Sequence, residues 1–221
     1  MDKIAQAKNV VREHIAAFDA ASIDALLAEG CRALSDDFLW RSMHPLYVQN
    51  GAADVVETFW RPLRTSMAYL QRREDIFFAG LNDVDSGASV WTCSMGHFVG
   101  LFDQDWLNIP KTGRMAHLRY AEFMRVANGK IVESALFFDL IGLMYQAGVY
   151  PLPPMTGEYF MYPGPRTHDG LILDNRPDNE TAETMAVINR MIADLSSINH
   201  LTSETCPPDL LRRTWQEDMI W

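Results

Sequence analysis

Apolar residues recur every three or four positions across residues 3–18, and charged side chains occupy the other face. This spacing predicts an amphipathic helix that buries one side. Ser22 is a suitable N-cap residue for a second short helix. Residues 51–70 also have helical spacing, which Pro62 interrupts. The first third of the chain is therefore predicted to be rich in helix.

β-Prone segments follow through the middle of the chain. Residues 36–40 are interpreted as the start of a first strand, residues 76–80 as a short strand and residues 88–101 as a long one. Gly96 inside the long strand is a candidate bulge position, because glycine in a strand often marks one. Residues 140–147 form a short predicted helix that ends at Gly148.

The strongest local signal is a hairpin centred on Asn128-Gly129. A type I′ turn needs positive φ at both central residues, which Asn-Gly supplies, and β-prone runs flank the pair. With a two-residue turn, one face of the hairpin carries Leu118, Tyr120, Glu122, Met124, Glu133, Ala135, Phe137 and Asp139. Three carboxylates and a phenol among apolar residues suit a pocket wall. They also suit a half-solvated face whose acids pair with arginines, and the pattern leaves both readings open.

Helices first and antiparallel strands afterwards predict an α+β fold, with the helices on one face of a curved antiparallel sheet. We expect a domain over residues 1–148. Five prolines then punctuate a predicted arm or linker at 149–180, and a helical extension follows at 181–221. The sheet can leave a cavity at its open end.

The chain ends on Gln216-Glu-Asp-Met-Ile-Trp221, which is similar to Ser35-Asp-Asp-Phe-Leu-Trp40. Two short predicted helices precede each segment. We interpret the extension as the start of a second copy of the domain, and chance similarity of a short string stays open. A real repeat would have to dock on the first domain or on a partner chain.

Composition narrows the class of protein. The 221 residues carry a formal net charge of −10 with a pI of about 5.0, which argues against nucleic acid or an anionic membrane as a partner. Charged residues near the N-terminus replace the apolar core of a signal peptide, and there is no membrane-spanning run, so the cytoplasm is the expected location. The cysteines are expected to be buried reduced thiols; they are Cys31, Cys93 and Cys206.

Cofactor and metal chemistry find no support in the sequence. The six histidines lack ligand-like spacing, and the chain has no dinucleotide, phosphate-loop, serine-hydrolase or zinc-protease motif. We therefore expect neither a cofactor nor a metal.

Two residues are candidates for catalysis. Asp139 follows two phenylalanines, where a carboxyl group can serve in proton transfer, but aspartate is also a good N-cap for the predicted helix 140–147. His97 lies in the long strand beside Gly96, where it is either a structural hydrogen-bonding group or a catalyst. Trp40 and Trp60 are candidates for the core or for a pocket wall.

Several motifs together resemble the SnoaL-like polyketide cyclase (ester cyclase) family of the nuclear transport factor 2-like superfamily. The similarity covers about residues 5–148. The motifs are Ser94-Met-Gly-His97-Phe-Val-Gly100, Pro110-Lys-Thr112-Gly-Arg114, Glu122-Phe-Met-Arg125, Asn128-Gly-Lys-Ile131 with Glu133, Asp139, and Tyr145-Gln-Ala-Gly148.

The resemblance implies a cystatin-like cone in which helices close a curved sheet over a deep apolar pocket, and a homodimer formed through the sheet. It implies ring closure of an apolar, oxygenated small molecule by intramolecular aldol condensation, without cofactor or metal. Asp139 would be the acid/base residue and His97 a pocket histidine. The predicted pocket residues are Trp40, Trp60, Tyr120, Glu122 and Phe137.

Some positions depart from the family pattern. Ala135 stands where an aromatic residue is usual, and Arg41-Ser-Met-His44-Pro45 replaces a stretch rich in glycine and proline, so we expect a different substrate. Limonene-type epoxide hydrolases share the fold but need an Arg-x-Asp motif that residues 88–101 lack. A non-catalytic small-molecule binder is the other alternative. Pairing of Asp139 with a buried arginine would favour binding, and a free Asp139 near His97 would favour catalysis.

Overall fold

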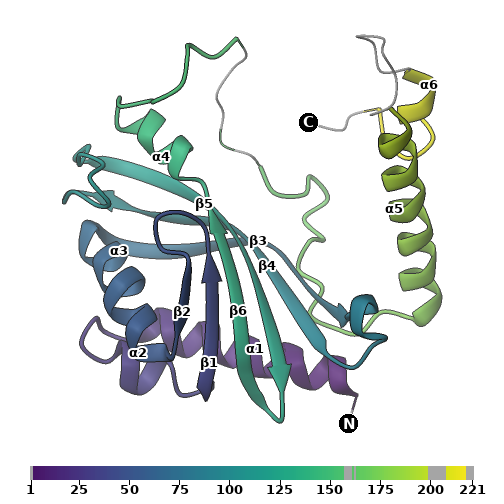
Figure 1. Ribbon diagram of the computed structural model, residues 1–221, viewed down its shortest axis with the longest axis horizontal. Helices are drawn as coiled ribbons and strands as arrows, with labels where there is room; N and C mark the ends of the chain where they lie inside the picture. The colour runs from purple at the N-terminus through teal and green to yellow at the C-terminus, as the bar shows by residue number, and fades with distance from the viewer. Residues whose placement is uncertain (1, 157–160, 162, 199–207, 218–221) are drawn as a thin grey trace. The chain divides into compact units, whose positions relative to one another are not determined.

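The computed structural model describes residues 2–156, 161, 163–198 and 208–217, and the chain divides into two units, Met1–Asp174 and Asn175–Trp221. Unit 1 is built on a six-stranded sheet with strand order β2-β1-β6-β5-β4-β3 (Figure 1). All neighbours are antiparallel except β1 and β6. The strands are β1 (Leu34–Ser42), β2 (Val48–Asn50), β3 (Met67–Leu81), β4 (Val90–Phe102), β5 (Arg114–Ala127) and β6 (Lys130–Phe138). The predicted α+β class is confirmed.

Helices cover one face of this sheet (Figure 1). Helix α1 (Lys3–Ala20) begins at Asp2, whose side chain accepts a hydrogen bond from the Ile4 amide, and it buries its apolar stripe against the strands. The remaining helical segments of this layer are the π-turn η1 (Leu26–Gly30), α2 (Ala52–Val55), the π-turn η2 (Val56–Trp60) and α3 (Arg61–Ser66). A 3₁₀ turn, η3 (Asp83–Asp85), joins β3 to β4.

The helix predicted over residues 51–70 is shorter than expected, since β3 already begins at Met67. Pro62 does not interrupt it. The π-turn η2 ends with the Arg61 amide bonded to the Val56 carbonyl, and Pro62 follows in the first turn of α3, where a missing N–H is tolerated. The short strand expected at residues 76–80 is in fact the second half of a strand of 15 residues.

The bulge expected at Gly96 lies on the opposite strand. The register between β3 and β4 shifts between Glu74 and Ile76, so Asp75 is the extra residue. A Cβ atom at Gly96 would lie 2.0 Å from the Arg73 carbonyl oxygen. Glycine is therefore required here by the close approach of the two backbones.

The predicted hairpin forms, with φ of 52° at Asn128 and 73° at Gly129. Its register differs from the simple expectation, because a shift between Arg125 and Val126 pairs Arg125 with Glu133. The extra residue in β6 places the side chains that follow it on the face of the sheet opposite to the one expected. Phe138 therefore points into the core, and Phe137, predicted to line the pocket, lies on the outer face with 51% of its surface exposed.

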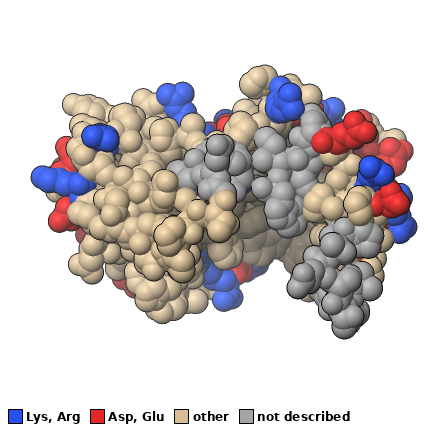
Figure 2. Space-filling model, turned by 90° about the horizontal axis from the view of Figure 1, so that it is seen from above, with Lys and Arg blue, Asp and Glu red and all other residues tan. Residues whose placement is uncertain are grey.

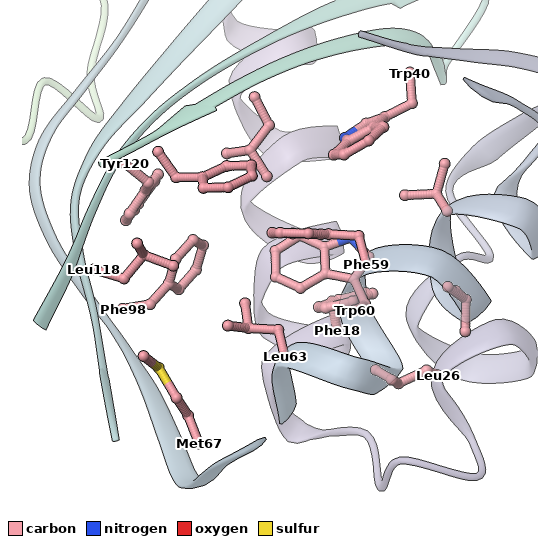
Figure 3. Close-up of a cluster of buried hydrophobic side chains, with 14 of the residues drawn as sticks. Phe18, Leu26, Trp40, Phe59, Trp60, Leu63, Met67, Phe98, Leu118 and Tyr120 are labelled. Atoms are coloured by element: carbon pink, nitrogen blue, oxygen red, sulfur yellow. The ribbon is translucent and has the colours of Figure 1, made fainter. Parts of the chain in front are cut away.

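The core lies between the helices and the concave face of the sheet (Figure 3). Aromatic rings fill much of it, with Phe59 stacked on Phe138 at a centroid distance of 5.2 Å and Phe98 on Tyr120 at 4.3 Å. Helix α4 (Leu140–Gln146) closes one end of the sheet and buries Leu143. Viewed from above, this end of unit 1 presents mostly uncharged side chains (Figure 2), which include exposed Ile141, Tyr145, Val149 and Leu152.

The end of the predicted linker belongs to unit 1. Phe77 on the outermost strand β3 pairs with this segment: its amide donates to the Gly170 carbonyl at 2.8 Å, and its carbonyl accepts from the Ile172 amide at 2.7 Å. Lys8, buried on α1, donates to the Asp174 carbonyl at 2.8 Å. Residues 170–174 are thereby tied to both the sheet and the first helix.

Unit 2 contains α5 (Asp178–Ile198) and α6 (Pro208–Leu211), close to the helices predicted there. Residues 218–221, on which the interpretation as a second copy depends, lie outside the described residues. Cys206 also lies outside them. Within the part of the chain that is described, no helix combines the length and apolar character that crossing a membrane demands.

Candidate functional site: a buried polar cluster inside the sheet

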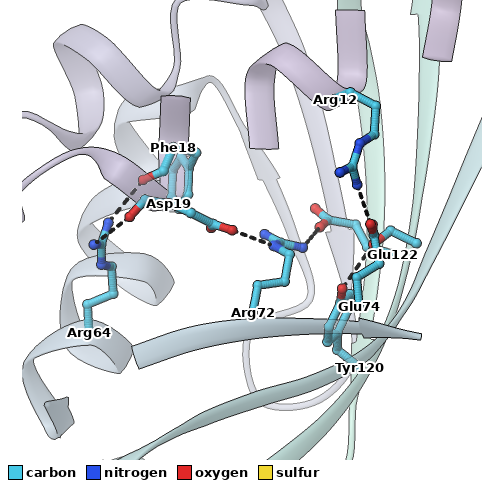
Figure 4. A network of polar contacts seen from close by, with 9 residues as sticks. Arg12, Phe18, Asp19, Arg64, Arg72, Glu74, Tyr120 and Glu122 are labelled. Atoms are coloured by element: carbon cyan, nitrogen blue, oxygen red, sulfur yellow. Dashed lines mark hydrogen bonds and ion pairs between the residues drawn. The ribbon is translucent and has the colours of Figure 1, made fainter. Parts of the chain in front are cut away.

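A buried ion pair lies on the concave face of the sheet. Arg72 projects from β3 and Glu122 from β5, and each side chain is only 4% exposed. The guanidinium Nη1 donates to Glu122 Oε2 at 3.1 Å, while Ser134 on β6 donates to Oε1 at 2.9 Å. Asp19 at the end of α1 lies 3.3 Å from Arg72 Nε (Figure 4).

Burial alone would lower the pKa of Arg72. The negative charge of Glu122, together with Tyr120 and Asp19, outweighs burial and holds this pKa above its usual value. Arg72 therefore stays charged, and its guanidinium carbon lies 5.0 Å from the centroid of Phe98 and 5.1 Å from that of Tyr120. Cation–π attraction of this kind compensates part of the cost of burying the charge.

A second polar layer adjoins the first (Figure 4). Ser94 on β4 donates to Glu74 Oε1 at 2.7 Å, and its hydroxyl lies 2.9 Å from the Tyr120 hydroxyl. Arg12 on α1 forms an ion pair with the same Glu74. Burial raises the pKa of Tyr120 to about 12, so the phenol is protonated at neutral pH.

The ion pair opens on a cavity of about 20 Å³. A space of this size holds a water-sized group, and a larger ligand requires the surrounding side chains to move. Its walls are mainly apolar and come from α1, β1, the helices α2 and η2, and the sheet. The lining residues include His14, Phe18, Phe38, Trp40, Trp60, Arg72, Glu122, Met124 and Ser134.

Three nitrogens of residues that line this cavity make no hydrogen bond to any described residue; one of them, Arg72 Nε, has Asp19 as an ion-pair partner, and the other two are unpaired. His14 Nδ1 and Trp40 Nε1 are both buried and have no hydrogen-bond partner within the described parts of the chain. Buried polar atoms are usually hydrogen-bonded, because leaving one unpaired costs about 1–3 kcal/mol. Unpaired nitrogens beside a cavity are therefore groups that a ligand could satisfy.

The structure brings together part of the predicted pocket. Trp40, Trp60 and Glu122 line the cavity, and Tyr120 lies behind them against Arg72. Phe137 is turned away by the bulge in the hairpin, which corrects its predicted place in the pocket.

Asp139 and His97 are not among the residues that line this cavity. Asp139 is the N-cap of α4, and its Oδ1 accepts a hydrogen bond from the Gly142 amide at 2.8 Å. His97 is buried on the other face of the sheet, where Nδ1 lies 3.5 Å from Asp75 Oδ2. The buried arginine, Arg72, is paired with Glu122 and Asp19 rather than with Asp139.

Sequence reasoning missed several members of the site, above all His14 and Arg72. His14 lies in the apolar stripe of α1 between Val11 and Phe18, a position from which a side chain reaches the core. Arg72 is followed by three more charged residues, a run that is typical of a loop. Arg72 and Glu74 are two positions apart and would share one face of a strand, and this pattern could have identified Arg72.

The cluster therefore combines a fixed positive charge, a carboxylate and two unpaired nitrogens in a largely apolar enclosure. Such an enclosure strengthens electrostatic interactions with a bound polar group. Among the described residues, no three His, Cys, Asp or Glu side chains converge in a way that could hold a metal ion.

These features define an α+β protein with a polar cluster enclosed between helices and a curved sheet. The model of the SnoaL-like domain matches residues 11–134, more than half of the chain, and the chain belongs to this family. Comparison with curated proteins gives no sequence match.

Solved structures share the fold. AclR of Streptomyces galilaeus, a candidate hydroxylase, superposes with a TM-score of 0.51 at 18% identity, over 68% of this chain and 90% of AclR. A candidate SnoaL-like polyketide cyclase from Jannaschia sp. CCS1 gives 0.50 at 16% identity, over 70% of this chain and 97% of its own. At these identities the likeness concerns the fold alone.

Proposed function

We propose that this protein is a cofactor-independent acid/base enzyme that acts on an apolar, oxygenated small molecule bound at the Arg72–Glu122 cavity. Ring closure by intramolecular aldol condensation, the reaction of polyketide cyclases, is the proposed chemistry. The observation that carries the proposal is the buried ion pair beside two unpaired nitrogens. A core that served packing alone would gain stability if such groups were replaced by apolar ones.

Each group has a role in this chemistry. The Glu122 carboxylate accepts a proton from a carbon flanked by carbonyl groups, and Arg72 stabilises the negative charge that develops on the enolate oxygen. The aromatic walls hold the nucleophilic carbon and the electrophilic carbonyl together and exclude water. The protonated carboxyl group then returns the proton to the alkoxide that forms in the new ring.

Asp139 is the residue that the family resemblance implies for the acid/base role. In this protein its carboxylate caps α4 and lies outside the cavity lining, so the proposal assigns the proton transfer to Glu122. The alternative function is non-catalytic binding of the same class of ligand. Both functions use the same cavity of about 20 Å³ and differ in whether the bound compound is converted.

Identification of co-purifying small molecules by mass spectrometry tests the proposed site. We expect the wild-type protein to retain an apolar oxygenated compound and Arg72→Met to lose it. Arg125→Met is the matched control, because Arg125 forms an ion pair with Glu133 on the outer face, 3.1 Å away. Equal retention by both variants would contradict the proposed site.

Turnover of the identified compound then separates the two functions. An enzyme converts the compound, and Glu122→Gln abolishes the conversion while the folded protein still binds it. Binding by the wild-type protein without any conversion would favour the non-catalytic alternative.

We further propose that two copies pair through the outer face of the sheet. Phe137 is exposed there and forms a ring contact with Phe123 at 6.4 Å, next to Ala135 and Ala121 on the same face. Burying such an apolar surface in a dimer is favourable.

A further inference from the structure

The hydrogen-bonding state of His14 follows from its surroundings. The backbone of Gly30 acts to raise the pKa of His14, as a carbonyl that accepts a hydrogen bond from the ring does. Nδ1 has no partner among the described residues, so Nε2 makes this bond. Because a carbonyl oxygen only accepts, Nε2 carries the hydrogen.

The ring of His14 is neutral at physiological pH. Burial, followed by the positive charge of Arg72, lowers the pKa of His14 to about 4. A neutral imidazole with its hydrogen on Nε2 has a lone pair on Nδ1. The unpaired Nδ1 of this cavity-lining residue is therefore a hydrogen-bond acceptor.

Trp40 supplies the complementary group. The residue is only 1% exposed, and its indole Nε1 is unpaired within the described segments. An indole N–H can only donate. Apart from the ion-paired Arg72 Nε, the cavity thus offers one unused acceptor from α1 and one unused donor from β1, and a hydroxyl group can satisfy both kinds of site.

Charge at the cavity argues against an anionic ligand. Arg72 is the cation at the lining. Its charge is balanced by the carboxylates of Glu122 and Asp19 at 3.1 and 3.3 Å, although Nε makes no hydrogen bond to a described residue. A carboxylate ligand would lose its hydration on entering the cavity, and no unpaired cation at the described lining would compensate that cost. It would also face the lone pair of His14.

Resting on the proposed function, we propose that His14 Nδ1 accepts a hydrogen bond from a ligand hydroxyl group, while the Trp40 indole donates to an oxygen of the same ligand. The site then takes neutral ligands with a hydroxyl on an apolar ring and rejects carboxylates. The rings of Phe18, Phe38, Trp40 and Trp60 supply the apolar walls. The cavity of about 20 Å³ accommodates the hydroxyl oxygen, and the ring enters as wall side chains move.

Three probes of similar size test this selectivity: phenol, anisole and benzoate. Anisole keeps the ring and the oxygen but lacks the donor, and benzoate carries the charge. Titrations followed by NMR are expected to give a dissociation constant at least tenfold lower for phenol than for anisole, with no binding of benzoate. His14→Phe is expected to remove the preference for phenol, whereas His117→Phe, on the outer face, keeps it.

The tautomer of His14 is a readout that needs no variant. Spectra of protein labelled with ¹⁵N-histidine at pH 7 are expected to show a neutral His14 ring with its hydrogen on Nε2. A hydrogen on Nδ1, or a charged ring, would overturn the inference whatever the probes do.

Shift mapping separates this inference from the proposed function. Probes that bind beside Arg72 and Glu122 without preferring phenol would overturn the role of His14 and leave the proposed site standing. Probes that bind elsewhere on the chain, or no binding of any probe, would overturn both.

Discussion

The side-chain amide of Gln146 pairs with the backbone of His117 as a neighbouring strand would. Its Oε1 accepts from the His117 amide at 2.9 Å, and its Nε2 donates to the His117 carbonyl at 2.7 Å. β6 has already ended at this level, since the Asp139 amide makes the last bond, to the Arg119 carbonyl. Gln146 thus extends the ladder beyond the last residue of β6, which gives the Gln-x-Gly end of α4 a structural purpose.

We expect Gln146→Ala to lower the free energy of unfolding by about 1–3 kcal/mol, because it leaves two backbone groups of β5 without their partner. Gln146→Glu loses the donor but keeps an acceptor, so its cost is expected to be similar. Urea denaturation measures both. Variants as stable as the wild type would show that solvent replaces the amide.

The buried ion pair is expected to show strong coupling. Arg72→Met alone leaves Glu122 buried without its cation and should cost about 3–5 kcal/mol, whereas Arg72→Met with Glu122→Leu should recover much of that loss. Arg125→Met on the outer face should cost less than about 1 kcal/mol, because its pair with Glu133 is partly exposed. Denaturation of the wild type, the two single variants and the double variant measures the coupling of Arg72 and Glu122. Additive losses of stability would contradict the expected coupling.

His14 predicts a specific dependence of stability on pH. Its pKa falls from 6.5 in the unfolded chain to about 4 in the folded protein, so its contribution is fully present above pH 6.5 and is lost as the pH falls towards 4. At 1.36 kcal/mol per unit, the loss amounts to roughly 3 kcal/mol. We expect His14→Phe to lose less stability than the wild type between pH 7 and pH 4.

Part of the acid sensitivity should remain in His14→Phe. Burial also lowers the pKa of His97, against the opposing effect of Asp75, so His97 acts in the same direction. Unfolding measured at several pH values distinguishes the two. Parallel curves for wild type and variant would show that folding does not shift the pKa of His14.

Substitutions at Asp139 separate its role as the N-cap of α4 from the acid/base role that the family resemblance implies. Asp139→Asn keeps an N-cap side chain, whereas Asp139→Ala removes it and should cost about 1 kcal/mol. On the proposed mechanism, Asp139→Asn keeps turnover of the identified ligand. Turnover lost in Asp139→Asn with binding intact would return the acid/base role to Asp139.

The outer face predicts the oligomeric state. We expect the wild-type chain to be a dimer by light scattering after size-exclusion chromatography and Phe137→Asp to be a monomer, because a charge there would be buried at the interface. Val84→Asp is the control, since Val84 lies in the turn η3 between β3 and β4 and is 94% exposed. A wild-type monomer would contradict the proposed pairing.

Local signals in the sequence predicted much of the fold. Asn128-Gly129 identified the hairpin, and helical spacing identified α1. The same signals could not reveal a bulge near Glu133, because an inserted residue leaves no mark in a pattern of alternating side chains. That single residue decides that Phe138 is buried and Phe137 is not.

The site was harder to predict for a related reason. Glu122 could be predicted from its place beside Tyr120 on one strand face. Its partner Arg72 is 50 residues away in sequence and lies within a charged run, so only the pairing of β3 with β4 and of β4 with β5 brings the two together. His14 comes from a third element, α1, and no sequence motif links it to either.

The pairing of Phe77 with residues 170–172 has a consequence for aggregation. β3 is the last strand of the sheet, and an uncovered edge strand is a template for pairing with another chain. The Gly170 carbonyl and the Ile172 amide occupy hydrogen-bonding groups of that edge, and Lys8 binds the carbonyl of Asp174, two residues after Ile172. A chain shortened to its first 150 residues would uncover this edge and leave the buried Lys8 ammonium without its carbonyl partner, so the segment after the family domain protects the sheet from self-association.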